Sequence, residues 1–164
     1  MEILKNIFTG TNLALLGAGL AVALPCMGSA KGVSLVGEAS SGLLTEDPSK
    51  FGKALALQAL PMTQGVYGLV AAFLILFQIG LFDTFTELSL LQGTYFFLAA
   101  IPYALVGYFS AIKQGRVSAS GINLIAKRPD QLGKAITSSA LVETYAIFAL
   151  LITLMMVFMC PFLG

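Results

Sequence analysis

Long apolar segments alternate with short polar breaks along the chain. The apolar segments cover residues 11–44, 54–82, 88–125 and 135–163, and the breaks between them read "TEDPSKFGK", "FDTFTE" and "AKRPDQLGK". Because an α-helix rises about 1.5 Å per residue, about 20 apolar residues span the hydrocarbon core of a bilayer. Each segment is longer than that. The pattern therefore predicts an all-α membrane protein with four transmembrane helices that extend beyond the bilayer on one side.

The two breaks that contain proline belong to an internal repeat. The stretch "PSKFGKALALQALPMTQG" aligns with "PDQLGKAITSSALVETYA" at an offset of 81 residues, so that Pro48 corresponds to Pro129 and Lys53 to Lys134. Upstream, "KGVSLVG" aligns with "GRVSASG" at an offset of 84, which predicts that three residues are missing from the second turn. The chain is thus predicted to be two tandem helical hairpins, residues 1–86 and 87–164, each of which needs the other to complete the bundle.

The N-terminus has some features of a secretory signal peptide, namely Lys5, an apolar run at residues 13–24 and the small residues "GSA" before Lys31. We expect that it is not cleaved, because its removal would destroy one of the two repeat units.

Composition and charge support a membrane location and predict an orientation. The chain is 57% hydrophobic and 10% charged, whereas soluble domains carry about 25% charged residues. Eight of the nine basic residues lie in or beside the repeat turns: Lys31, Lys50, Lys53, Lys113, Arg116, Lys127, Arg128 and Lys134. Lys5 lies on the other side, with Glu2, Asp83 and Glu87. The positive-inside rule then places both turns in the cytoplasm and both termini outside.

Several kinds of chemistry are excluded or disfavoured. The net charge of +1 provides no basic field for nucleic acid, and the absence of His excludes histidine-based metal or acid/base sites. Cys26 and Cys160 form no CxxC motif and are interpreted as small apolar thiols. Their depths in the bilayer should differ by roughly 16 Å, too far for a disulfide. The chain has no phosphate-binding loop, so it is not predicted to be an enzyme by itself.

Small residues recur at four-residue spacing on two of the predicted helices. They are Gly28 and Gly32 on the first helix, and Gly107, Ala111, Gly115 and Ala119 on the third. Such residues let backbones approach closely in lipid. The spacing fits packing inside the four-helix bundle and equally fits the crowded inner wall of a ring of several copies.

The fourth helix carries one acid, Glu143, in an otherwise uncharged run from residue 135 to the C-terminus. Charged residues inside a span are rare and usually functional. The second turn is centred between Arg128 and Pro129, and Gln114 and Glu143 are equally far from that centre on antiparallel helices. The two side chains should therefore lie at the same depth and could touch.

The second helix supplies further oxygen atoms at this depth. In the repeat, Glu143 corresponds to Met62, and Thr63 and Gln64 follow directly. Leu60, Thr63, Gln64 and Tyr67 share one helix face. Pro61 cannot donate a backbone hydrogen bond, so nearby carbonyls, including that of Leu60, become available as ligands.

This set of groups predicts a site for a small cation. Hard cations take oxygen ligands, and one carboxylate balances one charge, which favours Na⁺ over Ca²⁺ or Mg²⁺. Tyr67 could donate its hydroxyl proton to Glu143. An unpaired buried carboxylate must bind either a cation or a proton. The alternative interpretation is that Thr63, Gln64 and Gln114 only join the helices.

The same stretches carry a family resemblance that covers nearly the whole chain. "LPMTQGVYG", "KQGRVSASGI" and "LVETYAI" resemble the proteolipid (K or c-type) rotor-ring subunits of V-type ATPases, and in particular those of the bacterial Na⁺-pumping branch. The resemblance implies a homo-oligomeric ring in the plasma membrane of a bacterium. A separate soluble sector would hydrolyse ATP and turn the ring through a central-stalk subunit at the cytoplasmic turns. A stator subunit of the a/I type, with an essential arginine, would displace the ion.

The resemblance also implies the ligands of the transported Na⁺. They are the side chains of Thr63, Gln64, Gln114 and Glu143 and the carbonyl of Leu60, with Tyr67 hydrogen-bonded to Glu143. Met62 is a bulky departure that could crowd the site. Two alternatives to this interpretation stay open, a proton-translocating rotor of the same family and a self-contained four-helix channel or transporter.

Overall fold

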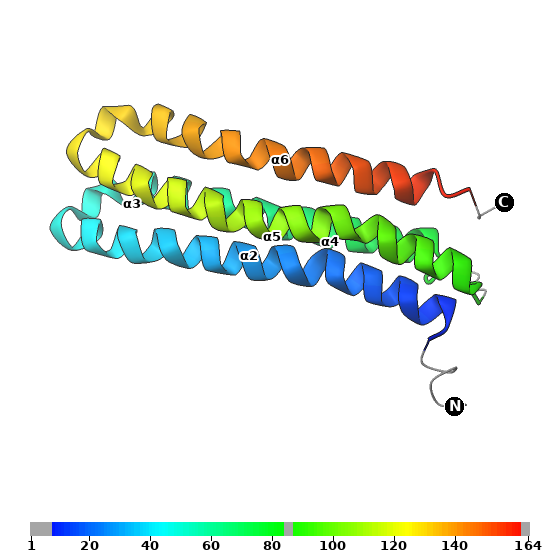
Figure 1. The fold of residues 1–164 in the computed structure, drawn as a ribbon. Coiled ribbons are helices and arrows are strands. Elements are labelled where there is room, and N and C mark those ends of the chain that lie inside the picture. The colour runs from blue at the N-terminus through cyan, green and yellow to red at the C-terminus, as the bar shows by residue number, and fades with distance from the viewer. Residues whose placement is uncertain (1–7, 84–86, 162–164) are drawn as a thin grey trace.

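The computed structural model describes residues 8–83 and 87–161, which form a bundle of long, roughly parallel helical columns (Figure 1). The elements in chain order are α2 (Gly10–Glu46), η1 (Pro48–Lys50), α3 (Phe51–Ala59), η2 (Leu60–Met62), α4 (Thr63–Gln78), α5 (Leu90–Lys127), η3 (Pro129–Gln131) and α6 (Leu132–Phe158). Within the described residues, four helical stretches are long and apolar enough to cross a membrane. The predicted all-α fold with four membrane-length helices is confirmed.

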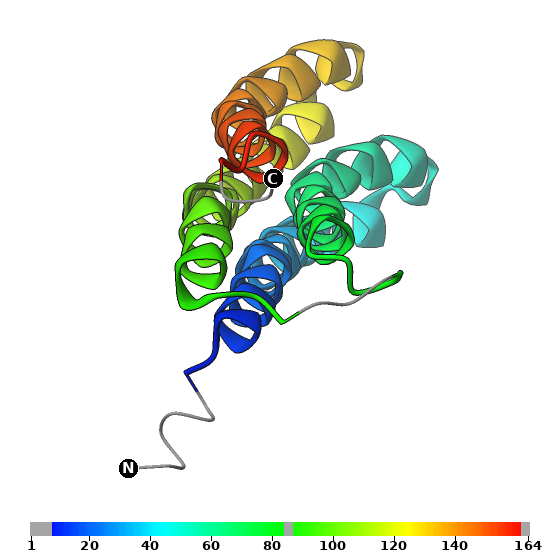
Figure 2. The same cartoon turned by 90° about the vertical axis from the view of Figure 1, so that its right-hand side faces the viewer.

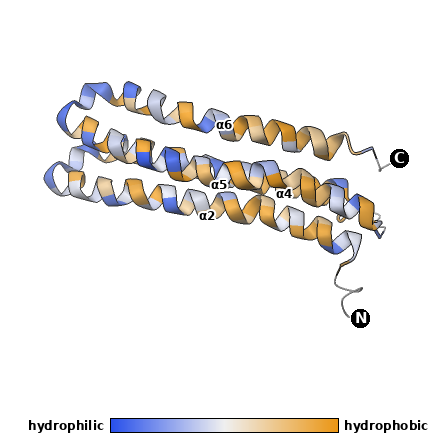
Figure 3. Ribbon diagram, viewed as in Figure 1, coloured by the Kyte–Doolittle hydropathy of each residue, from blue (hydrophilic) through white to orange (hydrophobic). Residues whose placement is uncertain are grey.

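The two hairpins lie side by side, and their first helices form the centre of the bundle. Figure 2 shows α2 next to α5, with α4 and α6 on their outer sides. The contact between α2 and α5 is the most extensive in the fold. Both repeat turns lie at one end, and hydrophilic residues gather there (Figure 3). Lys5 and Glu2, on which the predicted orientation partly rests, lie outside the described residues.

The two hairpin turns have the same construction, and their equivalent residues are separated by the same number of positions in the sequence. Helix α2 ends at Glu46 and α5 at Lys127, and the 3₁₀ turns η1 and η3 begin at Pro48 and Pro129. Both pairs are separated by 81 residues, so no residues are missing from the second turn. The prediction of a three-residue gap, which came from the offset of 84, is wrong. Each proline stands in the first turn of its 3₁₀ helix, where its missing N–H costs no hydrogen bond.

The second membrane-spanning column is broken at Pro61, where the sequence analysis expected the proline to disturb the helix hydrogen bonds. Pro61 has no N–H to donate to the preceding turn, and the chain tightens into the 3₁₀ turn η2 between α3 and α4. The Leu60 carbonyl accepts the backbone N–H of Thr63 across this turn. The break lies at the depth of Glu143, as the repeat register predicted.

Small residues bring α2 and α5 into close contact, so the stripes found in the sequence serve packing within one chain. A methyl group added at Gly28 would lie 2.5 Å from the Tyr108 carbonyl oxygen, and one added at Gly32 would lie 2.6 Å from that of Ala111. Glycine is therefore required at these positions. The closeness of the backbones explains how two 37- and 38-residue helices can pack in lipid without large interlocking side chains.

Two separate apolar clusters make up the core. One includes Ala14, Ile75, Phe96 and Val157, towards the end opposite the repeat turns, and the other includes Val36, Leu57 and Ile122, towards the turns. The buried polar side chains Ser29, Gln64, Ser110 and Gln114 belong to neither cluster. Both cysteines are free, as predicted.

We expect Gly32→Ala to destabilise the folded protein. Its methyl group would meet the Ala111 carbonyl at 2.6 Å, and overpacking of this kind costs about 1–3 kcal/mol. Gly42→Ala in the same helix is the matched control, because nothing lies within 4 Å of an added methyl group there. It should leave stability unchanged or raise it, since alanine is the better helix former. The measurement is thermal or denaturant unfolding of the purified protein in detergent, and equal effects would contradict the proposed close contact.

Candidate ion-binding site

Glu143 of α6 is held by two donors from two other helices. The Tyr67 hydroxyl on α4 donates to Glu143 Oε1 at 3.0 Å, and the Gln114 amide nitrogen on α5 donates to Glu143 Oε2 at 3.2 Å. The predicted contacts between Tyr67 and Glu143 and between Gln114 and Glu143 are thus present. An ionised carboxylate is an acceptor only, so both of its oxygens have a suitable partner.

The two glutamines link α4 to α5 at the same depth. Gln64 Nε2 donates to Gln114 Oε1 at 2.5 Å, and both side chains are 0% exposed. The helix pair therefore meets through a fully buried amide–amide contact. Such a contact fixes which way the Gln114 amide faces, because its oxygen is turned to Gln64 and its nitrogen to Glu143.

The remaining predicted oxygens gather at the break in the second column. Thr63 Oγ1 lies 3.0 Å from the Leu60 carbonyl oxygen and 3.4 Å from Gln64 Oε1. Oxygens that share a hard cation at roughly 2.4 Å, at right angles to one another, lie about 3.4 Å apart. The spacing of these three oxygens is therefore compatible with shared coordination. All six residues singled out in the sequence come together in one connected network.

Two residues of this network were missed by the sequence analysis. The Tyr103 hydroxyl donates to the Gln64 carbonyl at 2.6 Å, and Ser110 Oγ lies 3.4 Å from Gln64 Nε2 while donating to the Val142 carbonyl at 3.1 Å. Ser110 could have been found, because it lies one helical turn before Gln114 on the same face. Tyr103 lies about two helical turns before Ser110, and it contacts the network only because its long side chain reaches the Gln64 carbonyl.

Met62 does not point into this network. Its side chain is 53% exposed and lines a hollow of about 300 Å³ together with Val22, Cys26 and Ser29. Its backbone carbonyl accepts a weak hydrogen bond from Ser29 at 3.5 Å. The concern that Met62 crowds the site is not supported by this placement.

Within the part of the chain that the structure describes, Glu143 contacts neither a basic side chain nor a second acid. Across residues 8–83 and 87–161, the ion pairs are Lys50–Asp47 and Arg128–Asp130, both at the repeat turns. The same residues contain no group of three or more His, Cys, Asp or Glu side chains that could hold a metal ion. The carboxyl group of Glu143 is thus bonded to two neutral donors, the Tyr67 hydroxyl and the Gln114 amide, and to no charged side chain of the described residues.

Comparison with known proteins identifies the family to which the chain belongs. The family model of the ATP synthase C subunit matches the chain twice, over residues 16–75 and 97–156. The chain belongs to the ATP synthase C-subunit family. The two matched ranges are again 81 residues apart, and each covers the membrane-spanning part of one hairpin, so this family member contains two tandem C-subunit domains.

Two relatives extend the similarity to nearly the whole chain. The V-type sodium ATPase subunit K of Enterococcus hirae is 45% identical over 148 residues, which is 90% of this chain and 92% of the relative. The A-type ATP synthase subunit K of Methanocaldococcus jannaschii is 40% identical over 144 residues, which is 88% of this chain and 61% of the relative. This C-subunit homologue is therefore a multi-pass membrane proteolipid and a non-catalytic rotor subunit of a V/A-type rotary ATPase.

The contact between Gln64 and Gln114 can be tested by a double-mutant cycle. Either Gln64→Leu or Gln114→Leu leaves a buried amide without its partner, which costs about 1–3 kcal/mol of unfolding free energy. The loss of unfolding free energy in the double variant should therefore be smaller than the sum of the losses in the two single variants, by about 1 kcal/mol. Combining Gln64→Leu with Gln78→Leu, at the far end of α4, should be additive. Additive losses for the first pair, measured by unfolding in mixed micelles, would show that the amides do not interact.

Proposed function

We propose that this rotor subunit transports Na⁺ across the membrane, one ion per copy, on Glu143. The ligands would be Glu143, the side chains of Thr63, Gln64 and Gln114, and the carbonyl of Leu60, with Tyr67 orienting the carboxylate. The observation that carries the proposal is one carboxylate, without a basic partner among the described residues, that Gln114 and Gln64 connect to closely spaced neutral oxygens at the break in the second column. The name of the Enterococcus hirae relative, a sodium ATPase subunit, agrees with this choice.

The charge and the ligand types favour a monovalent hard cation. Carboxylate, amide, hydroxyl and carbonyl oxygens suit a hard cation. Ca²⁺ sites usually contain several carboxylates, whereas this set contains one, which balances a single positive charge. Binding would exchange hydrogen bonds for ion contacts. The Gln114 oxygen now accepts from Gln64 at 2.5 Å, so its amide would have to turn towards the ion. The Tyr67 hydrogen bond to Glu143 Oε1 could persist and hold the carboxylate in place.

Rotation against a stator requires that the carboxylate be neutral while it faces lipid. A bare charge at the bilayer centre costs at least roughly 2.5–3.5 kcal/mol, and a bound Na⁺ removes that cost. We infer that several copies form a ring in a bacterial plasma membrane, with the repeat turns in the cytoplasm against a central-stalk subunit. A stator subunit of the a/I type would supply an arginine that displaces the ion from Glu143.

The same network could hold a proton instead. A protonated Glu143 would donate from one oxygen to the Tyr67 hydroxyl and accept at the other from the Gln114 amide nitrogen, both of which are its neighbours in the structure. A proton carrier would not need the oxygens of Leu60 and Thr63. The sodium carrier and the proton carrier therefore differ in one testable respect, which is whether added Na⁺ competes with protons for Glu143.

A hydrophobic carbodiimide distinguishes them, because it attacks protonated carboxyl groups that face an apolar surface. We expect labelling of the intact complex to occur at Glu143. Added Na⁺ should slow the reaction, and more strongly as the pH rises, because a metal ion binds only the deprotonated ligand. The measurement is the labelling rate by mass spectrometry over a range of pH.

K⁺ at equal ionic strength is the control, and its larger radius should give less protection. If Na⁺ protects no better than K⁺ at any pH, the proton carrier replaces the sodium carrier. If Glu143 never reacts, it does not face lipid, and both rotor mechanisms lose support.

Gln114→Leu should weaken Na⁺ protection without preventing folding, since leucine is a good helix former. We expect the Na⁺ concentration for half-protection of Glu143 to rise roughly tenfold or more, as for lost partners at metal sites generally. Gln78→Leu, remote from the network, should leave it unchanged. Unchanged protection in both Gln64→Leu and Gln114→Leu would mean that the glutamines only join the helices.

A further inference from the structure

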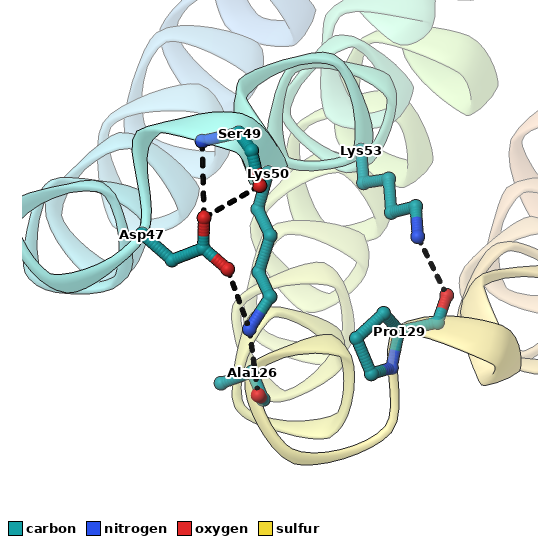
Figure 4. Close-up of polar contacts among 6 residues, drawn as sticks. All are labelled: Asp47, Ser49, Lys50, Lys53, Ala126 and Pro129. Atoms are coloured by element: carbon teal, nitrogen blue, oxygen red, sulfur yellow. Dashed lines mark hydrogen bonds and ion pairs between the residues drawn. The ribbon is translucent and has the colours of Figure 1, made fainter.

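Hydrogen bonds between the two repeat turns hold the hairpins at a fixed depth relative to each other. Lys53 Nζ donates to the Pro129 carbonyl at 3.1 Å, and Lys50 Nζ donates to that of Ala126 at 2.9 Å (Figure 4). Lys50 also pairs with Asp47 at 3.3 Å. The close backbone contact between α2 and α5 opposes sliding of the helices as well. An exchange of hydrogen-bond partners at the ion site must therefore come from the rotation of side chains.

The side-chain amide of Gln64 is the group that would lose its partner when an ion binds. Its nitrogen donates to Gln114 Oε1 at 2.5 Å, and the Gln64 side chain is 0% exposed. This bond is lost if Gln114 turns its oxygen towards Na⁺, as the proposed ligand set requires. The Tyr103 hydroxyl holds the Gln64 backbone carbonyl at 2.6 Å, so the amide end alone can move. A buried N–H without an acceptor is costly, and the loaded site therefore needs a second acceptor.

Ser110 is placed to be that acceptor. Its Oγ lies 3.4 Å from Gln64 Nε2 and donates its own proton to the Val142 carbonyl at 3.1 Å. A hydroxyl has one proton and two lone pairs, so the bond to Val142 leaves the lone pairs of Ser110 available to Gln64. Among the described residues, Gln114 and Ser110 are the acceptors within hydrogen-bond distance of this nitrogen. The site thus already contains a second acceptor, which is 6% exposed.

We propose that Ser110 is a positioning residue of the sodium site, which accepts the Gln64 amide when the ion takes Gln114. Without the ion, Gln64 donates mainly to Gln114, and Ser110 is the more distant partner, as the distances of 2.5 and 3.4 Å indicate. With the ion, a small rotation brings the Gln64 nitrogen onto Ser110 Oγ and leaves its oxygen beside Thr63. Both glutamine oxygens can then face the ion while no buried N–H is left unpaired.

This inference rests on the proposed sodium transport and adds the residue that stabilises the loaded form. In the described part of the chain, Ser110 bonds Gln64 and the Val142 backbone and does not bond the carboxyl group of Glu143. Loss of its hydroxyl should therefore lower the affinity for Na⁺ and leave the uptake of a proton by Glu143 unchanged. A residue that only joins the helices would not separate these two properties.

The test is carbodiimide labelling of Glu143 in the intact complex carrying Ser110→Ala. The Na⁺ concentration for half-protection should rise roughly tenfold, as expected for one unpaired buried amide in the loaded site. The labelling rate without Na⁺, measured over a range of pH, should stay that of the unchanged chain. Ser110→Thr keeps the hydroxyl and should restore the half-protection concentration. A hollow of about 380 Å³ beside Ser110, lined also by Phe109 and Val142, leaves room for the added methyl group.

Ser118→Ala is the matched control on the same helix. Ser118 Oγ shares a hydrogen bond of 2.6 Å with Ser139 Oγ on α6, and both residues are 0% exposed. This variant therefore also loses a buried hydrogen bond between α5 and α6, but the lost bond does not involve Gln64. Its half-protection concentration should equal that of the unchanged chain. In a Gln64→Leu background, Ser110→Ala should cause no further rise, because the amide that it pairs is already gone.

Four results would overturn the role of Ser110 while Na⁺ still protects the unchanged chain. They are an unchanged half-protection concentration in Ser110→Ala, an equal rise in Ser118→Ala, an equal rise in Ser110→Thr, and a further rise in the Gln64→Leu background. In each case the proposed sodium transport stands and this inference alone fails. If Na⁺ does not protect the unchanged chain, the sodium carrier and the role of Ser110 are rejected together.

Discussion

The arrangement of the helices depends on keeping one carboxylate inside the membrane, that of Glu143, which has no basic partner among residues 8–83 and 87–161. Water is excluded there, so every hydrogen bond to the acid must come from the protein. Tyr67 and Gln114 provide these bonds from two different helices, and Gln64 then holds Gln114. Three helices must therefore stay at a fixed depth relative to one another. A slip of one residue along any of them would leave a buried polar group unpaired.

The rest of the bundle can be understood as the support for that alignment. The close approach of α2 and α5 at Gly28 and Gly32 gives a rigid centre on which the outer helices rest. The lysines of the first turn fix the second turn through backbone carbonyls, at one end of the bundle. The 3₁₀ turn at Pro61 places the Leu60 carbonyl and the Thr63 hydroxyl beside Gln64. In place of the i→i+4 hydrogen bond of a continuous α-helix, the Leu60 carbonyl accepts the backbone N–H and the hydroxyl of Thr63.

Much of this arrangement could be predicted from the sequence, because a hairpin with a known turn fixes depth. The equal distances of Gln114 and Glu143 from the second turn predicted a contact that the structure contains. The offset of 84 misled the alignment of the first and third helices, because small residues recur there every three or four positions and a short slip matches similar residues. Tyr103 and the placement of Met62 could not be predicted, since both depend on which side of a helix meets which neighbour. The ligand roles of the six network residues stay predictions.

The two hairpins share one fold but differ in chemistry at the position of the acid, Met62 in the first and Glu143 in the second. The hairpins share their turns and the offset of every turn element, so either half can keep the packing surface. The acid position of the first half is Met62, whose exposed side chain needs no hydrogen-bond partner. A second acid there would require a second set of donors, yet its neighbours on α2 are Cys26 and Ser29, and Ser29 already accepts the Gly65 N–H at 2.9 Å. Methionine at this position therefore brings no charge that the two neighbours would have to stabilise, and it leaves an exposed apolar side chain at the depth where the other half holds Glu143.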